Sequence, residues 1–132
     1  MRLKTLLVAN AGVSLVYGLA LLLAPSHLLA LYGAHLDPVA LMLARLFGAV
    51  TLTICLVAWL ARNASRTDDT FLALATALAV GDAIGIGVAT HAAVTGVVNL
   101  WGWTTVVLYA GLTAGYGYFA FVRPAPIAAR FT

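Results

Sequence analysis

Charge is scarce in this chain, and glutamate is absent altogether. Only 8% of the 132 residues are charged, whereas 64% are hydrophobic, and the mean hydropathy is +1.05. So few charged side chains cannot cover the surface of a soluble globule. The composition therefore excludes an ordinary soluble domain and predicts an integral membrane protein of the all-α class.

Cysteine and basic residues are also few, and each shortage excludes a class of function. Cys55 is the one cysteine, so the chain can form neither an internal disulfide nor a CxxC redox pair. The seven basic residues are scattered and form no basic face, which argues against nucleic-acid binding. No paired carboxylates, nucleophile with a base, phosphate-binding loop or metal-ligand spacing is present. We therefore expect neither a metal nor another cofactor.

Four apolar runs approach the roughly 20 residues that a helix needs to cross a bilayer. They cover about residues 5–24, 38–61, 70–94 and 100–122. The Asp37-Pro38 pair is typical of a helix start, since an aspartate caps the first turn and proline suits the first helical position. Residues 25–37 are too few to span and predict a short interfacial segment. The whole chain, 1–132, then forms a single membrane domain, a four-helix up-and-down bundle.

The loops carry basic residues on one side only. Six lie before the first run, between the second and third, or after the fourth, and none lies in the other two loops; the six are Arg2, Lys4, Arg62, Arg66, Arg123 and Arg130. The positive-inside rule places both termini in the cytoplasm. We therefore expect a multi-pass protein of the inner (cell) membrane, with the lipid bilayer as its first partner.

Arg45 is the one basic residue that orientation does not explain, because it lies inside the second run. At about 1.5 Å per residue it lies roughly 10 Å below the outer surface, and Asp82 in the third run lies roughly 12 Å below it. Tyr17 and Tyr109 fall at similar depth. We expect these four residues to form an outer-leaflet polar cluster. Arg45 and Asp82 should face inward and pair, since a charge at the centre of a membrane helix costs about 2.5–3.5 kcal/mol.

Three interpretations of this cluster stay open: a structural ion pair, a site for a ligand or proton, and a contact with a partner subunit. Asn10, Ser14 and Asn99 are secondary polar candidates. Asn10 and Ser14 lie one turn apart, and a hydrogen bond between helices is the favoured explanation. Small residues four apart, which permit close helix packing, occur in every run: Ser14 and Gly18, Ala44 and Gly48, Gly81 and Gly85, Gly111 and Gly115.

The segments LYGAHLDPVALMLARLFGA (31–49) and GVVNLWGW (96–103) resemble small bacterial four-helix membrane proteins of the DoxX-like and domain-of-unknown-function kind. Arg45, Asn99, Gly102 and Trp103 fit the pattern of such proteins, whereas an aspartate at position 82 is less usual in it. The resemblance implies a compact membrane bundle and assigns no reaction.

Three classes of function remain. The first is a non-enzymatic membrane protein, either an accessory or assembly subunit or a binder of a small hydrophobic ligand. Its protein partners would be further copies of the chain, in a homo-oligomer, or the subunits of a larger membrane complex. The second is a small transporter or channel with Arg45 and Asp82 as its ion or proton site. The third is a membrane enzyme that acts on a lipid or quinone. The lack of catalytic motifs favours the first class.

Overall fold

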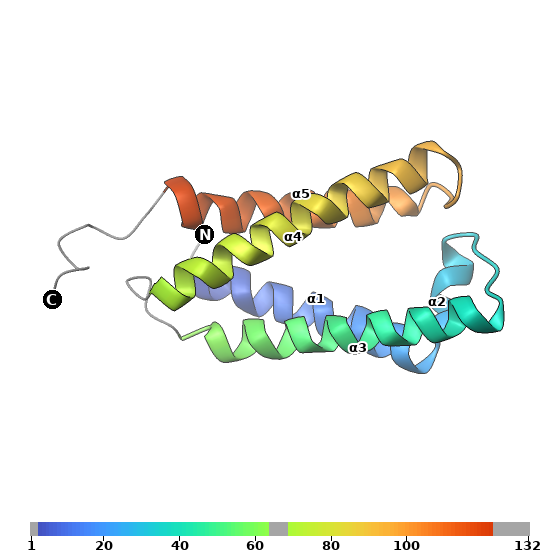
Figure 1. Ribbon diagram of the computed structural model, residues 1–132, viewed down its shortest axis with the longest axis horizontal. Coiled ribbons are helices and arrows are strands. Elements are labelled where there is room, and N and C mark those ends of the chain that lie inside the picture. Colours follow the sequence, from blue (N-terminus) through green and yellow to red (C-terminus); the bar gives the residue numbers. More distant parts are fainter. Residues whose placement is uncertain (1–2, 64–68, 123–132) are drawn as a thin grey trace, which may run out of the picture.

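The computed structural model of the protein describes residues 3–63 and 69–122, and these residues are helical with short connections (Figure 1). No strand occurs within these two ranges. The elements are α1 (Leu3–Leu23), α2 (Pro25–Leu31), α3 (Pro38–Ala61), α4 (Asp69–Val94) and α5 (Gly102–Gly117), and a π-helical turn (Tyr118–Val122) continues α5. The basic loop that the sequence predicts around residues 62–69 lies largely outside the described residues.

Four of these helical segments are long and apolar enough to cross a membrane: α1, α3, α4 and the continuous stretch Gly102–Val122. The first three agree with the predicted runs to within two residues at each end. The fourth helix begins at Gly102 rather than at residue 100, because the preceding residues form a turn. In that turn the Asn99 side-chain oxygen accepts a hydrogen bond from the Trp101 backbone N–H at 3.0 Å, and such local bonding competes with helix.

The short segment between the first two long helices is itself a helix. Proline occupies the first position of both α2 and α3, where its missing N–H would have had no helical partner. Asp37 caps α3 as the sequence predicts, since its Oδ1 accepts a hydrogen bond from the Ala40 backbone N–H at 2.8 Å. We call the end of the molecule that carries α2 the α2 end, and the opposite end the N-terminal end (Figure 1).

The long helices pack as two pairs, α1 with α3 and α4 with α5. Glycines allow both close approaches. A Cβ added to Gly48 would lie 2.8 Å from the Leu22 backbone nitrogen and 2.9 Å from the Gly18 carbonyl oxygen, so the α1 and α3 backbones are in contact there. In the other pair, a Cβ on Gly85 would lie 3.0 Å from the Tyr109 ring. Two of the predicted small-residue stripes therefore face each other between α1 and α3.

The apolar core lies at the N-terminal end and joins the two pairs. Its buried members come from the start of α1, the end of α3, the start of α4 and the end of the last helix: Leu3, Leu6, Leu7, Ala11, Ala58, Phe71, Ala75, Ala79, Tyr116, Phe119 and Ala120. Leu6 fills the space that a side chain at Gly115 would need, with its methyl carbons 2.9 Å from the added Cβ. Elsewhere most large apolar side chains are exposed, as expected of helices that face lipid.

Candidate functional site

Polar side chains follow the junction between the two helix pairs, from the α2 end toward the N-terminal core. They form three groups. The first ties the α2 end together, the second surrounds Asp82 halfway along α4, and the third links α1 to α5 next to the core. Most of the side chains in these groups lie on α1 and α5, the helices that meet across the junction.

The first group is a set of hydroxyls, which we call the tyrosine clamp: Tyr17 on α1, Tyr32 after α2 and Thr105 on α5. The Tyr17 and Tyr32 hydroxyls are 3.0 Å apart and share a hydrogen bond, and Thr105 donates to the Tyr32 hydroxyl at 3.3 Å. Burial alone would raise the pKa of Tyr32, but hydrogen bonds from Thr105, Tyr17 and Thr104 outweigh it and lower that pKa below its usual value. This direction fits a phenol oxygen that acts mainly as an acceptor.

Asn99 reinforces the clamp from the connection between α4 and α5. Its side-chain amide donates to the Leu31 carbonyl oxygen at 2.8 Å, and its backbone N–H donates to the Tyr32 carbonyl oxygen at 3.0 Å. Gly33 adopts φ +77° beside it, a left-handed conformation that glycine adopts without a steric penalty. Asn99 therefore joins the loop after α2 to the second helix pair, which is a role the sequence did not reveal.

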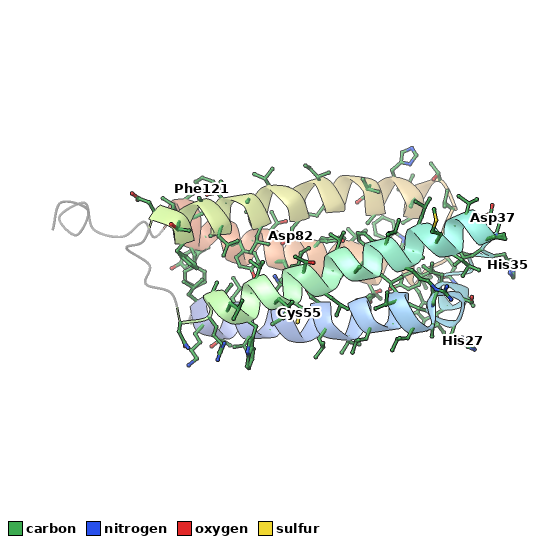
Figure 2. The ribbon with its side chains drawn as sticks, turned by 60° about the horizontal axis from the view of Figure 1, so that its bottom comes forward. His27, His35, Asp37, Cys55, Asp82 and Phe121 are labelled. Atoms are coloured by element: carbon green, nitrogen blue, oxygen red, sulfur yellow. The ribbon has the colours of Figure 1, made fainter. Side chains whose placement is uncertain are left out.

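Asp82 is the centre of the second group and lies near the middle of α4 (Figure 2). Its Oδ2 atom is buried and has no hydrogen-bond partner, although the side chain as a whole is partly exposed. The carboxyl group is close enough to the phenols of Tyr109 and Tyr116 to interact with both electrostatically. The Thr113 hydroxyl, on the same helix as the two phenols, is likewise buried without a partner. One polar atom on α4 and one on α5 are thus buried without a hydrogen-bond partner.

The third group supplies the helix-to-helix hydrogen bond expected for Asn10 and Ser14. The Asn10 side-chain amide donates to the Tyr116 hydroxyl at 2.7 Å, and the Ser14 hydroxyl donates to the Asn10 side-chain oxygen at 3.1 Å. Asn10 and Ser14 are buried, with 3% and 6% of their surfaces exposed. All three side chains therefore have partners, and this group joins the two helix pairs without offering a free polar atom to a ligand.

Arg45 does not join these groups, which corrects the expected ion pair. The side chain is exposed on α3, and α3 packs against α1 rather than against α4, where Asp82 lies. Arg45 and Asp82 form no ion pair in the described parts of the chain. A similar depth along the two helices was the reason to expect this pair, but depth alone does not specify the direction in which each side chain points.

The structure brings Tyr17 and Tyr109 within electrostatic range of each other, as it does Tyr109 and Asp82. Three of the four residues of the predicted cluster thus follow one another along the junction. Sequence reasoning missed Tyr32 and Tyr116, which hold the groups at either end. Tyr116 is fully buried and its hydroxyl accepts a hydrogen bond from Asn10, whereas its neighbour Tyr118 is exposed.

Two other features do not contribute to the site. Within residues 3–63 and 69–122, no three His, Cys, Asp or Glu side chains are placed to hold a metal ion. An open groove runs along α4, lined by Asp69, Leu72, Ala73, Thr76, Ala77, Val80, Gly81 and Ile84. Asp82 is not among its lining residues, because it faces the helix junction instead.

The protein is thus small and all-helical in its described residues. It has four helices suited to span a membrane, and polar side chains lie along the junction between its two helix pairs. Residues 1–119 match the family described as Domain of unknown function (DUF8292), and the chain belongs to that family. No curated protein matched the chain. No solved structure matched it either.

Proposed function

We propose that this is a membrane protein that binds a small amphiphile bearing a hydrogen-bond donor, with Asp82 as the acceptor. The observation that supports this proposal is the buried, unpartnered Oδ2 of Asp82 halfway along α4. An unsatisfied carboxylate oxygen away from water is costly, so a bound donor group stabilises it. The side chain is also partly exposed, which leaves one side open to a ligand that arrives from the bilayer.

The polar surroundings favour an amine or a hydroxyl group over an acid on this amphiphile. Asp82 interacts electrostatically with the phenols of Tyr109 and Tyr116, and a second carboxylate beside Asp82 would repel the first. The exposed apolar side chains on both sides of the junction suit an alkyl or isoprenoid tail.

We further propose that the protein lies in the inner membrane as an up-and-down bundle with both termini in the cytoplasm. The four candidate spans and the six basic residues that the sequence distributes to one set of loops support this orientation. Of these six, Lys4 and Arg62 fall among the described residues, at the start of α1 and directly after α3. A reporter enzyme active only outside the cytoplasm, fused at the α2–α3 connection, should be active, whereas the same fusion at the C-terminus should be inactive.

The ligand proposal is tested with decylamine, decanol and decanoate as probes and with Asp82→Asn as the variant. A hydrogen bond to a charged group contributes about 1.5–3 kcal/mol, so Asp82→Asn should weaken decylamine binding roughly 10- to 100-fold and decanol binding less. Asp69→Asn is the matched control, because it removes an exposed carboxylate from the same helix. Equal decylamine affinity of the wild type and Asp82→Asn would contradict the proposal, as would a preference for decanoate.

A second candidate is proton or ion transport, and the succession of polar groups along the junction favours it. The tyrosine clamp, Asp82 and the Asn10–Tyr116 bond follow one another between the two helix pairs. In such a transporter Asp82 would bind the transported proton or ion, and Arg45 would not contribute to the ion site because it is exposed on α3. Liposomes containing the protein should then show a flux that Asp82→Asn abolishes and Asp69→Asn preserves. Absence of flux for protons and common cations would eliminate this candidate.

A further inference from the structure

Arg45 is an exposed cation inside a helix suited to span a membrane, and nothing in the described chain neutralises it. The side chain is exposed on α3, and it makes no hydrogen bond or ion pair among the described residues. A cation that faces lipid is costly unless it finds an anion or reaches the headgroup layer. The anion must therefore come from outside this part of the chain.

The acidic residues of the described chain are engaged or distant. Asp37 precedes α3, but its Oδ1 already accepts the hydrogen bond that caps the helix. Asp82 belongs to the junction on another helix, and Asp69 starts α4 at the N-terminal end. None of the three is placed to pair with Arg45 within its own molecule.

Depth places Arg45 just below one interface of the membrane. It lies seven residues after Pro38, so its Cα lies about 10 Å below the start of α3. Exposed Trp101 and Trp103 begin the last helix at the same end of the molecule, and tryptophans concentrate at the membrane interface. The hydrogen bond from Asn99 to the Leu31 carbonyl holds that connection level with α2. A long arginine side chain at this depth extends toward the headgroups.

We propose that Arg45 binds the phosphodiester group of an anionic phospholipid at the α2 end of the protein. The planar guanidinium donates two parallel hydrogen bonds to phosphate oxygens, a geometry that lysine does not reproduce. His27 and His35 are also exposed at this end (Figure 2) and add hydrogen-bonding groups at the headgroup level. This inference rests on the proposed membrane insertion but is independent of a ligand at Asp82.

The test is native mass spectrometry of the full chain, titrated with phosphatidylglycerol or with phosphatidylcholine, because one spectrum reports both bound lipid and oligomeric state. Arg45→Gln should lower phosphatidylglycerol occupancy at least about threefold, a loss of roughly 0.7 kcal/mol, with less effect on phosphatidylcholine. Arg62→Gln is the matched control. Arg62 follows the other end of α3, and its guanidinium is already held against the Trp59 ring, 4.0 Å from the centroid, so phosphatidylglycerol occupancy should change little.

Three outcomes would overturn the inference. Unchanged phosphatidylglycerol occupancy in Arg45→Gln would show that Arg45 binds no lipid phosphate, and an equal loss in Arg62→Gln would show diffuse attraction to basic residues. Dissociation of an oligomer in Arg45→Gln, with lipid binding intact, would identify a partner's carboxylate instead. If Arg45→Gln does not fold, Arg45→Lys is measured in its place. This variant should lose less phosphatidylglycerol occupancy than expected for Arg45→Gln, and an unchanged occupancy would count against the inference.

Failure of the proposed function gives different results from failure of this inference. A chain that does not insert would not be recovered from the membrane fraction at all. A chain that inserts but does not bind donor-bearing amphiphiles would show no effect of Asp82→Asn on decylamine, and its response to Arg45→Gln would still be readable. Asp82→Asn should leave phosphatidylglycerol occupancy unchanged.

Discussion

Replacing Gly48 with alanine should destabilise the protein by forcing the α1 and α3 backbones apart. The added Cβ would lie 2.8 Å from the Leu22 nitrogen and 2.9 Å from the Gly18 carbonyl oxygen, whereas ordinary van der Waals contact begins at 3.4 Å. Both neighbouring atoms belong to the backbone, so no side chain can rotate away. The helices must separate locally by about 0.6 Å, which is 3.4 minus 2.8, and overpacking of this kind costs about 1–3 kcal/mol.

Gly12→Ala is the matched control for this substitution. Gly12 lies within α1, and a Cβ there would meet nothing within 4 Å. Alanine in a helix interior is favoured over glycine by about 0.5–1 kcal/mol, so Gly12→Ala should be neutral or slightly stabilising. Gly48 also lies in a helix interior, so this propensity gain is common to both variants, and they should differ in unfolding free energy by the overpacking cost of about 1–3 kcal/mol.

The unfolding free energies are best measured by steric trapping in mixed micelles, which avoids strong denaturant. The wild type, Gly48→Ala and Gly12→Ala are compared under identical lipid and detergent conditions. The reasoning would be refuted if Gly48→Ala matched Gly12→Ala within about 0.5 kcal/mol, the usual effect of a substitution that makes no special contact. Such a result would mean that α1 and α3 are not in backbone contact at this position.

Three further substitutions test other contacts by the same measurement. Tyr116→Phe removes the acceptor for the buried Asn10 amide and should cost about 0.6–2 kcal/mol; no loss of stability would show that this hydrogen bond does not join the helix pairs. Asp37→Ala removes the hydrogen bond that caps the Ala40 N–H and should cost about 1 kcal/mol, whereas Asp37→Asn should retain most of it. Gly85→Ala places a Cβ 3.0 Å from the Tyr109 ring and should cost about 1–3 kcal/mol. Stability close to that of the wild type would show that α4 and α5 are not tightly packed at this position.

Much of the fold could be predicted from the sequence because hydrophobic length is a local property. Apolar runs specified four long helices, and the aspartate and proline at positions 37 and 38 correctly marked the start of α3. The short helix α2 was predicted as an interfacial segment from its length and composition. The start of the last helix was missed by two residues, since a side-chain hydrogen bond from Asn99 decides it and composition does not report such a bond.

The candidate site was only partly predictable, because its members come from different helices. Counting along each helix predicts neighbouring depths for Tyr17, Asp82 and Tyr109, and in the structure Tyr109 interacts electrostatically with each of the other two. The same counting placed Arg45 with them, but rotation about the helix axis and the choice of helix partner exclude it. Tyr32 could not be foreseen, because its hydroxyl meets Tyr17 only when the chain turns back after α2.

The sequence by itself determined that the helices are apolar and how long they are, since these properties depend on residue order and helical rise alone. The tertiary structure decided which helices are neighbours and which way each side chain points. It therefore separated the two charges that lie within the apolar helices, leaving Asp82 at the junction with an unpartnered oxygen and Arg45 exposed on α3. A charge in a membrane span must find a partner, and only helix packing determines whether that partner lies within the protein or outside it.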